Sequence, residues 1–423
     1  EEVVVRERLT DRSFSVVRPI QRPHSAQIFP ATQFGHQDAD MRAAVGLISR
    51  NIVIRGGDSD LSTEQLFGVH TGVFHGGLYR LEHAEVHTCG QGHILGRYCT
   101  HAHMVGKGAR GSYVENMGIH HSFQRAATIH GVTHYEVRNN VAYEVKGHTF
   151  FVEDGAETWN VIEENLVITT RKSFASLKSD LKPASFWMAS PLNIWRSNYA
   201  AGCVNDGYWF EPPGIPHGPS ATSTICPVRW FVGEFWNNSA SGNGVHGLRI
   251  YPTYLPHEDP CDPSSPPKPQ FFYNFTSFRN GGHGIFGKQN GDLHHINAKL
   301  LDNGGDDQRW VKFPRTDVVY RPNLPNIDHQ LVVADSLGYL AGRPYRGGKV
   351  GIMMPQDEFF HARDVMFVGY GNAGAFAGCA KCGSSTDMKQ GSYTYRVEGF
   401  RFEETLARVR WDPPYKDIFW DLD

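Results

Sequence analysis

The chain has 423 residues, of which 40% are hydrophobic, 12% aromatic and 20% charged, with 45 glycines and a formal net charge of −3. This composition supplies a buried core and excludes a disordered chain or a helical bundle. The lack of a dense Lys/Arg cluster argues against nucleic acid as a partner. No run of about 18 apolar residues is present that could span a membrane.

The first residues alternate apolar and charged positions, as in EEVVVRERLTDRSF, which is typical of edge strands. We expect residues 1–40 to be the tail of a preceding β-rich domain or an N-terminal cap. They lack the basic start and apolar middle of a signal peptide. The chain opens on EEVVV and closes on FWDLD, so we expect it to be a piece of a longer protein that belongs to a larger assembly.

Residues 41–305 are repetitive, with units such as VGLISRNIVIRG, THYEVRNNVAYEVKG and WNVIEENLVITT. Each unit is a short β-branched or aromatic run, an Asn or Gly corner and another short run. A recurrence of about 20–27 residues indicates a solenoid. Because no unit has a helical half, we predict an all-β fold, a right-handed parallel β-helix. A β-sandwich is the competing fold, but it would show hairpin turns with strict alternation.

Corners and insertions complete this pattern. Asparagine tolerates the left-handed conformation that a corner needs, so we assign that role to Asn139, Asn140, Asn165, Asn198, Asn238 and Asn280. The Pro-rich segments 212–226 and 252–269 break the period and are expected as loop insertions on one face. The pattern returns at FFHARDVMFVG and YTYRVEGFRFEET, so residues 306–423 should continue the β-helix and form a C-terminal cap.

Seven of the 22 histidines lie between residues 96 and 155, among them His101, His103, His120, His121, His130 and His148, together with two adjacent carboxylates, Glu153 and Asp154. Residues two apart in a strand share a face, so His101 and His103 should project together. Aligning THAHM, ATIHG and VEDG on successive rungs places His103, His130 and Asp154 in one column. Such groups, with His101 beside them, are ligands of a divalent metal, zinc or calcium.

The same residues have two other interpretations. His130, Glu153 and Asp154 could form a catalytic proton-transfer row without metal. Solenoids also stack like residues in ladders for structural reasons alone, and that interpretation stays open.

Aromatic residues follow on the next units: Phe150, Phe151, Phe186, Trp187, Tyr208, Trp209 and Phe210. Outward members of this set would form a stacking platform for sugar rings, so Trp209 is a candidate substrate-binding residue. Glu211 would add a second carboxylate, and glycoside hydrolases usually use two. Arg249 could bind an acidic sugar, because a guanidinium matches a carboxylate.

Cysteines and glycosylation sequons favour an extracellular or cell-surface location. Cys203, Cys226 and Cys261 flank the Pro-rich segments, where a bridge would fit an oxidising compartment. Cys379 and Cys382 form a lone C-x-x-C, which is weak evidence for zinc. The sequons begin at Asn237 and Asn274, and we expect Asn274 to be the better glycosylated of the two.

The motifs DMRAAVGLISRNIVIRG, GRYCTHAHMVG, GIHHSF, TIHG, GHTFFVEDG and ASFWMASPLN resemble the parallel β-helix region shared by fibrocystin-L and the cell-migration-inducing, hyaluronan-binding hyaluronidases. The resemblance is strong from Asp40 to Tyr251 and weaker beyond. The short gap between MVG and SYVEN is more similar to the fibrocystin-L branch.

Two functions follow from these observations. The first is an extracellular module that binds, and in the hyaluronidase branch depolymerises, an acidic polysaccharide such as hyaluronan. The second is a non-catalytic structural or receptor ectodomain of fibrocystin-L type, part of a ciliary or cell-surface filament. Because the histidine motif occurs in both branches, its presence does not separate them.

Overall fold

The computed structural model describes residues 1–34, 37–57, 64–305, 308–311, 326–329, 332–334, 350–353, 358–370, 375–377 and 393–410. The chain divides into two units, Glu1–Val45 and Gly46–Asp423. In the first unit, β1 (Val5–Thr10) pairs antiparallel with β2 (Ser13–Val16). A second antiparallel pair joins β3 (Ile28–Phe29) to β4 (Ala39–Asp40), and η1 (Ala31–Phe34) lies between them in the chain.

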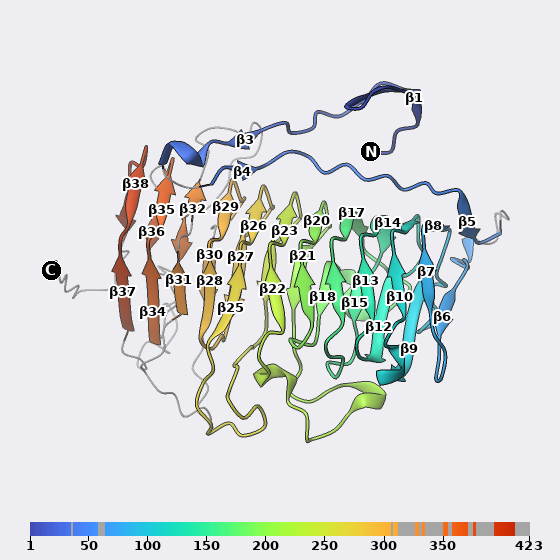
Figure 1. Cartoon of the computed structure of the whole chain (residues 1–423). Helices are drawn as coiled ribbons and strands as arrows, with labels where there is room; N and C mark the ends of the chain where they lie inside the picture. The colour runs from blue at the N-terminus through green and yellow to red at the C-terminus, as the bar shows by residue number, and fades with distance from the viewer. Residues whose placement is uncertain are drawn as a thin grey trace. The chain divides into compact units, whose positions relative to one another are not determined.

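The second unit is a parallel β-helix, which confirms the predicted fold (Figure 1). Successive strands enter three sheets in turn, so each rung adds one strand to each sheet. Among the described residues the sheets have 12, 12 and 11 strands. We name them the first, second and third sheet in the order in which the chain enters them.

The first sheet contains β5 (Ile52–Arg55), β8 (Ala84–His87), β11 (Gly118–His120), β14 (Val141–Lys146), β17 (Leu166–Arg171), β20 (Tyr199–Ala201), β23 (Ser239–Ser241), β26 (Thr276–Phe278), β29 (Lys299–Leu301), β32 (Val332–Ala334), β35 (Met366–Val368) and β38 (Arg401–Glu403). The second sheet contains β6 (Thr71–Val73), β9 (Thr100–Gly106), β12 (Ala127–Val132), β15 (Phe150–Val152), β18 (Ala184–Met188), β21 (Asp206–Phe210), β24 (Leu248–Ile250), β27 (Ile285–Lys288), β30 (Gln308–Val311), β33 (Ile352–Met353), β36 (Phe376–Ala377) and β39 (Val409–Arg410).

The third sheet contains β7 (Arg80–Glu82), β10 (Tyr113–Glu115), β13 (Glu136–Arg138), β16 (Val161–Glu163), β19 (Ile194–Arg196), β22 (Glu234–Trp236), β25 (Gln270–Tyr273), β28 (Leu293–Ile296), β31 (Asn326–His329), β34 (Glu358–Arg363) and β37 (Tyr393–Glu398). Short 3-10 turns lie in the connections: η2 (Lys107–Ala109), η3 (Lys178–Leu181), η4 (Gly218–Ser220) and η5 (Pro227–Arg229). Strands β30–β39 continue all three sheets beyond residue 305.

The core forms because the middle residue of most three-residue strands points inward while its neighbours point out. In the third sheet the inward column runs through Val114, Val137, Ile162, Trp195 and Phe235, all fully buried. The second sheet adds a stack of inward rings, with centroids of Phe150 and Phe186 5.3 Å apart and of Phe186 and Tyr208 4.7 Å apart. The inward residues of the second sheet are thus occupied in the core, and only its outward residues can contact a ligand.

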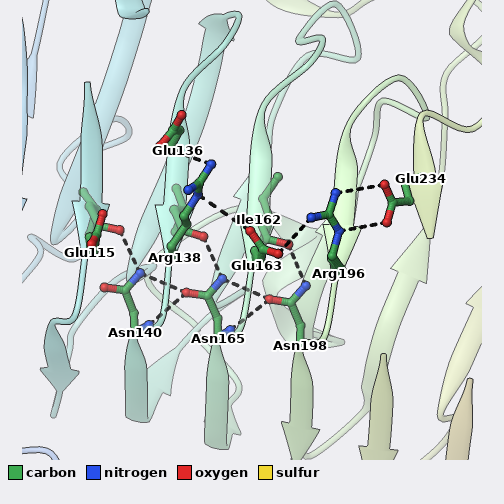
Figure 2. A network of polar contacts seen from close by, with 12 residues as sticks. Glu115, Glu136, Arg138, Asn140, Ile162, Glu163, Asn165, Arg196, Asn198 and Glu234 are labelled. Atoms are coloured by element: carbon green, nitrogen blue, oxygen red, sulfur yellow. Dashed lines mark hydrogen bonds and ion pairs between the residues drawn. The ribbon is translucent and has the colours of Figure 1, made fainter. Parts of the chain in front are cut away.

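Asparagines at the corner between the third and first sheets form a buried ladder (Figure 2). Asn165 donates through Nδ2 to the carbonyl of Val137 at 2.8 Å and to Oδ1 of Asn198 at 3.0 Å. Its own Oδ1 accepts from the backbone N and from Nδ2 of Asn140, at 3.1 and 2.9 Å. The ladder satisfies backbone groups that a sharp corner would otherwise leave buried and unpaired.

The prediction that these asparagines adopt the left-handed conformation was wrong for most of them. Asn139 has φ 50°, but at the later corners the left-handed residue precedes the ladder asparagine: Glu164, Ser197, Asn237 and Arg279. The asparagine is required instead because its amide both donates and accepts along the rungs.

Charged residues also stack on the outer face of the third sheet. Arg196 contacts Glu163 at 3.0 Å and binds Glu234 through Nε and Nη2 at 2.8 and 2.9 Å (Figure 2). Opposite charges on neighbouring rungs favour the parallel register, although half-exposed pairs contribute only about 0–1 kcal/mol each.

Candidate functional site

Three of the predicted histidines converge on the outer face of the second sheet. Strands β9 and β12 pair in parallel with His103 opposite His130, and His101 lies two residues before His103 on the same face. The imidazole rings of His101 and His103 have centroids 4.9 Å apart, and those of His103 and His130 are 4.7 Å apart. One ring nitrogen from each residue lies within 4.8 Å of the others.

His101 is held as a neutral imidazole. Its Nδ1 lies 2.8 Å from the carbonyl oxygen of Gly96, to which it must donate because a carbonyl only accepts. Its Nε2 is buried and has no hydrogen-bond partner among the described residues. Burial lowers the pKa of His101 to about 3, so this nitrogen keeps its lone pair at neutral pH.

His130 connects the other histidines to the two carboxylates. Its Nε2 lies 2.9 Å from Oδ2 of Asp154, and its Nδ1 lies 3.1 Å from Nδ1 of His103 and 3.6 Å from Oε2 of Glu153. Burial opposes protonation, but the hydrogen bond to Asp154 and the charge of Glu153 together raise the pKa of His130 above its usual value. Burial, and then the neighbouring His130, lower the pKa of His103.

The two carboxylates have opposite shifts. Burial raises the pKa of Glu153, whose Oε2 has no hydrogen-bond partner among the described residues. Burial acts in the same direction on Asp154, but hydrogen bonds with His130 and Ser220 outweigh it and lower the pKa of that carboxyl. Adjacent acids therefore sit in different protonation environments, which is common at functional sites.

The predicted rung alignment was wrong by one residue on the third rung. Ile129 pairs with Val152, so the residue in line with His130 is Glu153 and not Asp154. The expectation that only one carboxylate faces the histidines also fails, because β15 ends at Val152 and the chain then turns. That turn brings the Asp154 carboxylate to Nε2 of His130, while the Glu153 carboxylate stays near Nδ1 of the same ring.

A buried residue that the sequence analysis did not single out holds this turn. Glu157 accepts hydrogen bonds from the backbone N–H groups of Gly131, Asp154 and Gly155, at 2.9, 3.0 and 2.8 Å. It thereby ties the carboxylate turn to β12 of the neighbouring rung. Only its place in VEDGAE, close after the acidic pair, could have pointed to it.

The remaining histidines of the 96–155 stretch lie elsewhere. His120 and His121 lie at the end of β11 in the first sheet, where their Nδ1 atoms are 2.7 Å apart and His120 Nε2 contacts Glu85 at 3.1 Å. His148 is fully buried, stacks on Phe151 and contacts the tilted ring of Trp187. Beside it, the buried Arg125 binds Asp180 at 2.9 Å and covers the ring of Phe151 at 3.5 Å.

The predicted substrate-binding residues lie on the same face, farther along the β-helix. The register places His101, Thr128, Phe151, Trp187, Trp209 and Arg249 in one outward column. Glu211 directly follows β21, and its backbone N–H bonds the carbonyl of Met188 at 3.1 Å. The structure thus aligns Trp209, Glu211 and Arg249 with the histidines but separates them by intervening rungs.

Only part of the predicted aromatic platform faces outward. Phe150, Phe186, Tyr208 and Phe210 are core residues, whereas Phe151, Trp187 and Trp209 point away from the core. Phe151 and Trp209 are themselves largely covered, and Trp187 is half-buried.

Arg249 has a defined position at the far end of this column. Its guanidinium carbon lies 3.8 Å from the ring centroid of Trp209 and 4.4 Å from that of Tyr251, and its Nη1 contacts Asp206 Oδ2 at 3.3 Å. Lys288 also lies over the ring of Tyr251, with its Nζ 5.0 Å from the ring centroid. Tyr251 and Lys288 were missed, although the i, i+2 spacing of Arg249 and Tyr251 in RIY signals a shared face.

The Pro-rich insertions lie beside the site. The backbone N–H of His217 bonds the carbonyl of Asp154 at 2.9 Å, so the first insertion contacts the carboxylate turn. A disulfide between Cys226 and Cys261 joins the two insertions, while Cys203 is buried and unbridged. The sequence analysis did not find the Cys89–Cys99 disulfide, and Cys379 and Cys382 lie outside the described residues.

Taken together, fold and site define the chain as a parallel β-helix whose outer face carries histidines, carboxylates, aromatics and cations, a surface suited to polar ligands. Residues 66–248 match the CEMIP β-helix family model. The recognition made from the sequence motifs is confirmed, because this segment matches the family model and the chain is similar in sequence to fibrocystin-L and to the CEMIP proteins.

The similar proteins are much longer than the aligned segment. Fibrocystin-L from Mus musculus is 34% identical over 427 residues, which is 91% of this chain and 10% of that protein. The cell migration-inducing and hyaluronan-binding protein from Homo sapiens is 30% identical over 331 residues, 63% of this chain and 24% of that protein.

Among solved structures, the A-module of mannuronan C-5 epimerase AlgE4 from Azotobacter vinelandii matches with a TM-score of 0.33 and 9% identity, covering 81% of this chain and 86% of that one. No helix in the described part of the chain is both long and apolar enough to cross a membrane.

Proposed function

We propose that this chain is an extracellular or cell-surface β-helix module that binds an acidic polysaccharide of the hyaluronan type along the outer face of its second sheet. The observation that carries the proposal is the position of Arg249, whose guanidinium contacts the rings of both Trp209 and Tyr251 on the face that also bears the histidines. Lys288 adds a second cation one rung farther along.

The chemistry of this surface suits a chain of sugars that carry carboxylates. A guanidinium can bind a carboxylate through two parallel hydrogen bonds, and aromatic contacts restrict its motion before the ligand arrives. Asp206 orients Arg249 by accepting a hydrogen bond from Nη1 of the guanidinium. The Nε of Arg249 has no hydrogen-bond partner among the described residues. A continuous outward column along parallel rungs also matches the linear shape of a polysaccharide.

The relatives support the same ligand class and location. One relative bears the name hyaluronan-binding protein, and another from Homo sapiens, 28% identical over 331 residues, is named a cell surface hyaluronidase. The two disulfides fit an oxidising compartment outside the cytosol.

Binding is tested with hyaluronan oligosaccharides by isothermal titration calorimetry. Removing one charged, oriented hydrogen-bond donor typically costs about 1.5–3 kcal/mol, so Arg249→Ala should weaken binding about tenfold or more. Arg171→Ala is the matched control, because Arg171 is an exposed arginine paired with Glu144 on the first sheet. Equal affinities for wild type and Arg249→Ala, or equal binding of neutral dextran, would refute the proposal.

Depolymerisation is a second candidate, favoured by one relationship. Val152, Met188 and Phe210 are in register, and Glu153 and Glu211 follow the first and third of them. The two carboxylates therefore lie two rungs apart on one face, roughly 9.6 Å at the strand spacing, near the upper limit for an inverting pair of glycosidase acids. Burial raises the pKa of Glu211 to about 7, which suits a general acid.

Product analysis of hyaluronan incubated with the purified chain separates the two candidates. Hydrolysis that Glu153→Gln and Glu211→Gln each abolish supports the enzyme. Binding without any shortening of the polymer supports a non-catalytic module of fibrocystin-L type.

A further inference from the structure

We propose that His101, His103 and His130 form a binding site for one divalent transition-metal ion, with zinc as the favoured metal and Asp154 as an outer carboxylate that orients His130. The three residues come from adjacent strands β9 and β12, and their ligand atoms lie within 4.8 Å of one another. This inference does not depend on polysaccharide binding, since the metal can be measured by itself.

The spacing of the nitrogens is close to that of a tetrahedral site. Two histidines that bind zinc at about 2.0–2.1 Å in tetrahedral geometry hold their ligand nitrogens roughly 3.3 Å apart. The Nδ1 atoms of His103 and His130 are 3.1 Å apart. Metal binding would displace the proton that these two nitrogens otherwise share.

The other ring nitrogens are already fixed in the way metal-binding histidines require. Histidine ligands usually donate their second ring N–H to a carbonyl or a carboxylate, which sets the tautomer. His101 has the Gly96 carbonyl at Nδ1, leaving Nε2 for the metal, and His130 has Asp154 at Nε2, leaving Nδ1. His101 has an exposed fraction of only 3%, yet its Nε2 has no hydrogen-bond partner among the described residues.

This donor set selects among metals. Imidazole nitrogens suit zinc, cobalt, nickel and copper, whereas calcium takes six to eight oxygen ligands. Calcium, expected from the sequence as an alternative, therefore does not fit three nitrogens. Asp154, expected as a direct ligand, instead occupies the outer position behind His130.

A fourth coordination position is left beside Glu153. Its Oε2 is buried, lies 3.6 Å from His130 Nδ1 and has no hydrogen-bond partner among the described residues. A water molecule completing the tetrahedron could donate a hydrogen bond to this oxygen. Three protein ligands and one exchangeable position are typical of zinc sites that act on a substrate.

The competing explanation is a histidine ladder with no ligand. The His120–His121 pair in the first sheet shows that such contacts also arise without three converging nitrogens. Among the described residues, only the group of His101, His103 and His130 brings three ligand atoms this close. The pair in the first sheet is therefore a control for the proposal.

The experiment uses the whole chain without an affinity tag, stripped with EDTA and dialysed. Zinc is titrated by calorimetry, and Co²⁺ binding is followed by its visible absorption, which is intense for tetrahedral nitrogen ligation. We expect one ion per chain, and His103→Ala and His130→Gln should each lower the affinity at least a hundredfold and abolish the cobalt bands. His121→Asn removes the imidazole of His121 at a left-handed position that asparagine tolerates and should bind like wild type.

Circular dichroism of each variant establishes that the β-helix is intact, and the half-buried His103 is the substitution least able to disturb it. The proposal is overturned if wild type binds no zinc, if folded His103→Ala binds as tightly as wild type, or if His121→Asn loses the metal as well.

Discussion

His130 Nε2 lies 2.9 Å from Asp154 Oδ2 although Asp154 is one residue out of register with His130. The contact exists because β15 ends at Val152 and Glu157 holds the following turn against β12 through three backbone N–H groups. The regular repeat of the sheet supplies the histidines and Glu153, and the turn after β15 supplies Asp154. The candidate site therefore lies where a turn interrupts the regular rungs of the β-helix after Val152.

Asp154→Asn should weaken zinc binding without abolishing it. An amide keeps the shape of the carboxylate but loses the charge that strengthens His130 as a ligand, and the loss of such an outer partner typically costs about 10–100-fold in metal affinity. Competition titration against a chelator of known affinity measures this change. No change at all would remove Asp154 from the site, and complete loss would make it a direct ligand.

Asn165→Ala should be strongly destabilising. The substitution removes four buried hydrogen bonds and leaves the Val137 carbonyl and both donors of Asn140 without their partner. Buried groups left unpaired cost about 1–3 kcal/mol each, although relaxation reduces the sum, so we expect about 3 kcal/mol less free energy of unfolding. Denaturant titration measures it.

Arg138→Ala is the comparison for the ladder prediction. It removes half-exposed ion pairs with Glu136 and Glu163 on the outer face of the third sheet and should cost about 1 kcal/mol or less. If the two substitutions cost the same, the asparagine ladder has no special part in stability.

These two substitutions also show what the sequence could reveal. The recurrence of short strand–corner–strand units predicted the β-helix, because every rung of a solenoid repeats the same unit. Asparagines at corners were visible, but their role was not, since donation from Asn165 to Asn198 depends on rungs 33 residues apart. The pairing of His103 with His130 was predictable, because both residues lie at equivalent positions of neighbouring repeats. The turn after Val152 was not predictable, because it departs from the repeat.

Glycosylation should favour Asn237 over Asn274, the reverse of the expectation from sequence. Asn237 is exposed in the corner before β23, whereas Asn274 is half-buried and its Oδ1 accepts a hydrogen bond from Asn297 at 2.7 Å. In protein secreted from eukaryotic cells, Ser239→Ala should remove more glycan mass than Thr276→Ala. Intact-mass spectrometry before and after glycosidase treatment reads this out, and an equal or opposite order would contradict it.

Glu211 should make both stability and ligand binding depend on pH near neutrality. Burial raises the pKa of its carboxyl to about 7, although Arg249 and a hydrogen bond with Trp209 pull it down. The unfolded chain releases this proton near pH 4.5, so between pH 4.5 and 7 the folded chain holds more protons. Stability therefore falls as pH rises through this window, and the contribution is lost above the folded pKa.

Glu211→Gln removes the ionisable carboxyl group and should therefore flatten the change in melting temperature between roughly pH 5 and 8. Differential scanning calorimetry at several pH values measures this change. Burial also raises the pKa of Asp206 to about 6, but Asp206 is present in both proteins, so the difference between their curves isolates Glu211. Glu258→Gln, at an exposed position in the second insertion, should leave the wild-type profile unchanged.

The same ionisation should reach the ligand. Above about pH 7 the Glu211 carboxylate becomes negative beside Arg249 and opposes an acidic polysaccharide, so wild-type affinity for hyaluronan oligosaccharides should fall as pH rises from 6 to 8. In Glu211→Gln the affinity should change little over that range, because the neutral amide neither ionises nor repels. Parallel pH profiles of affinity for the two proteins would show that Glu211 does not face the ligand.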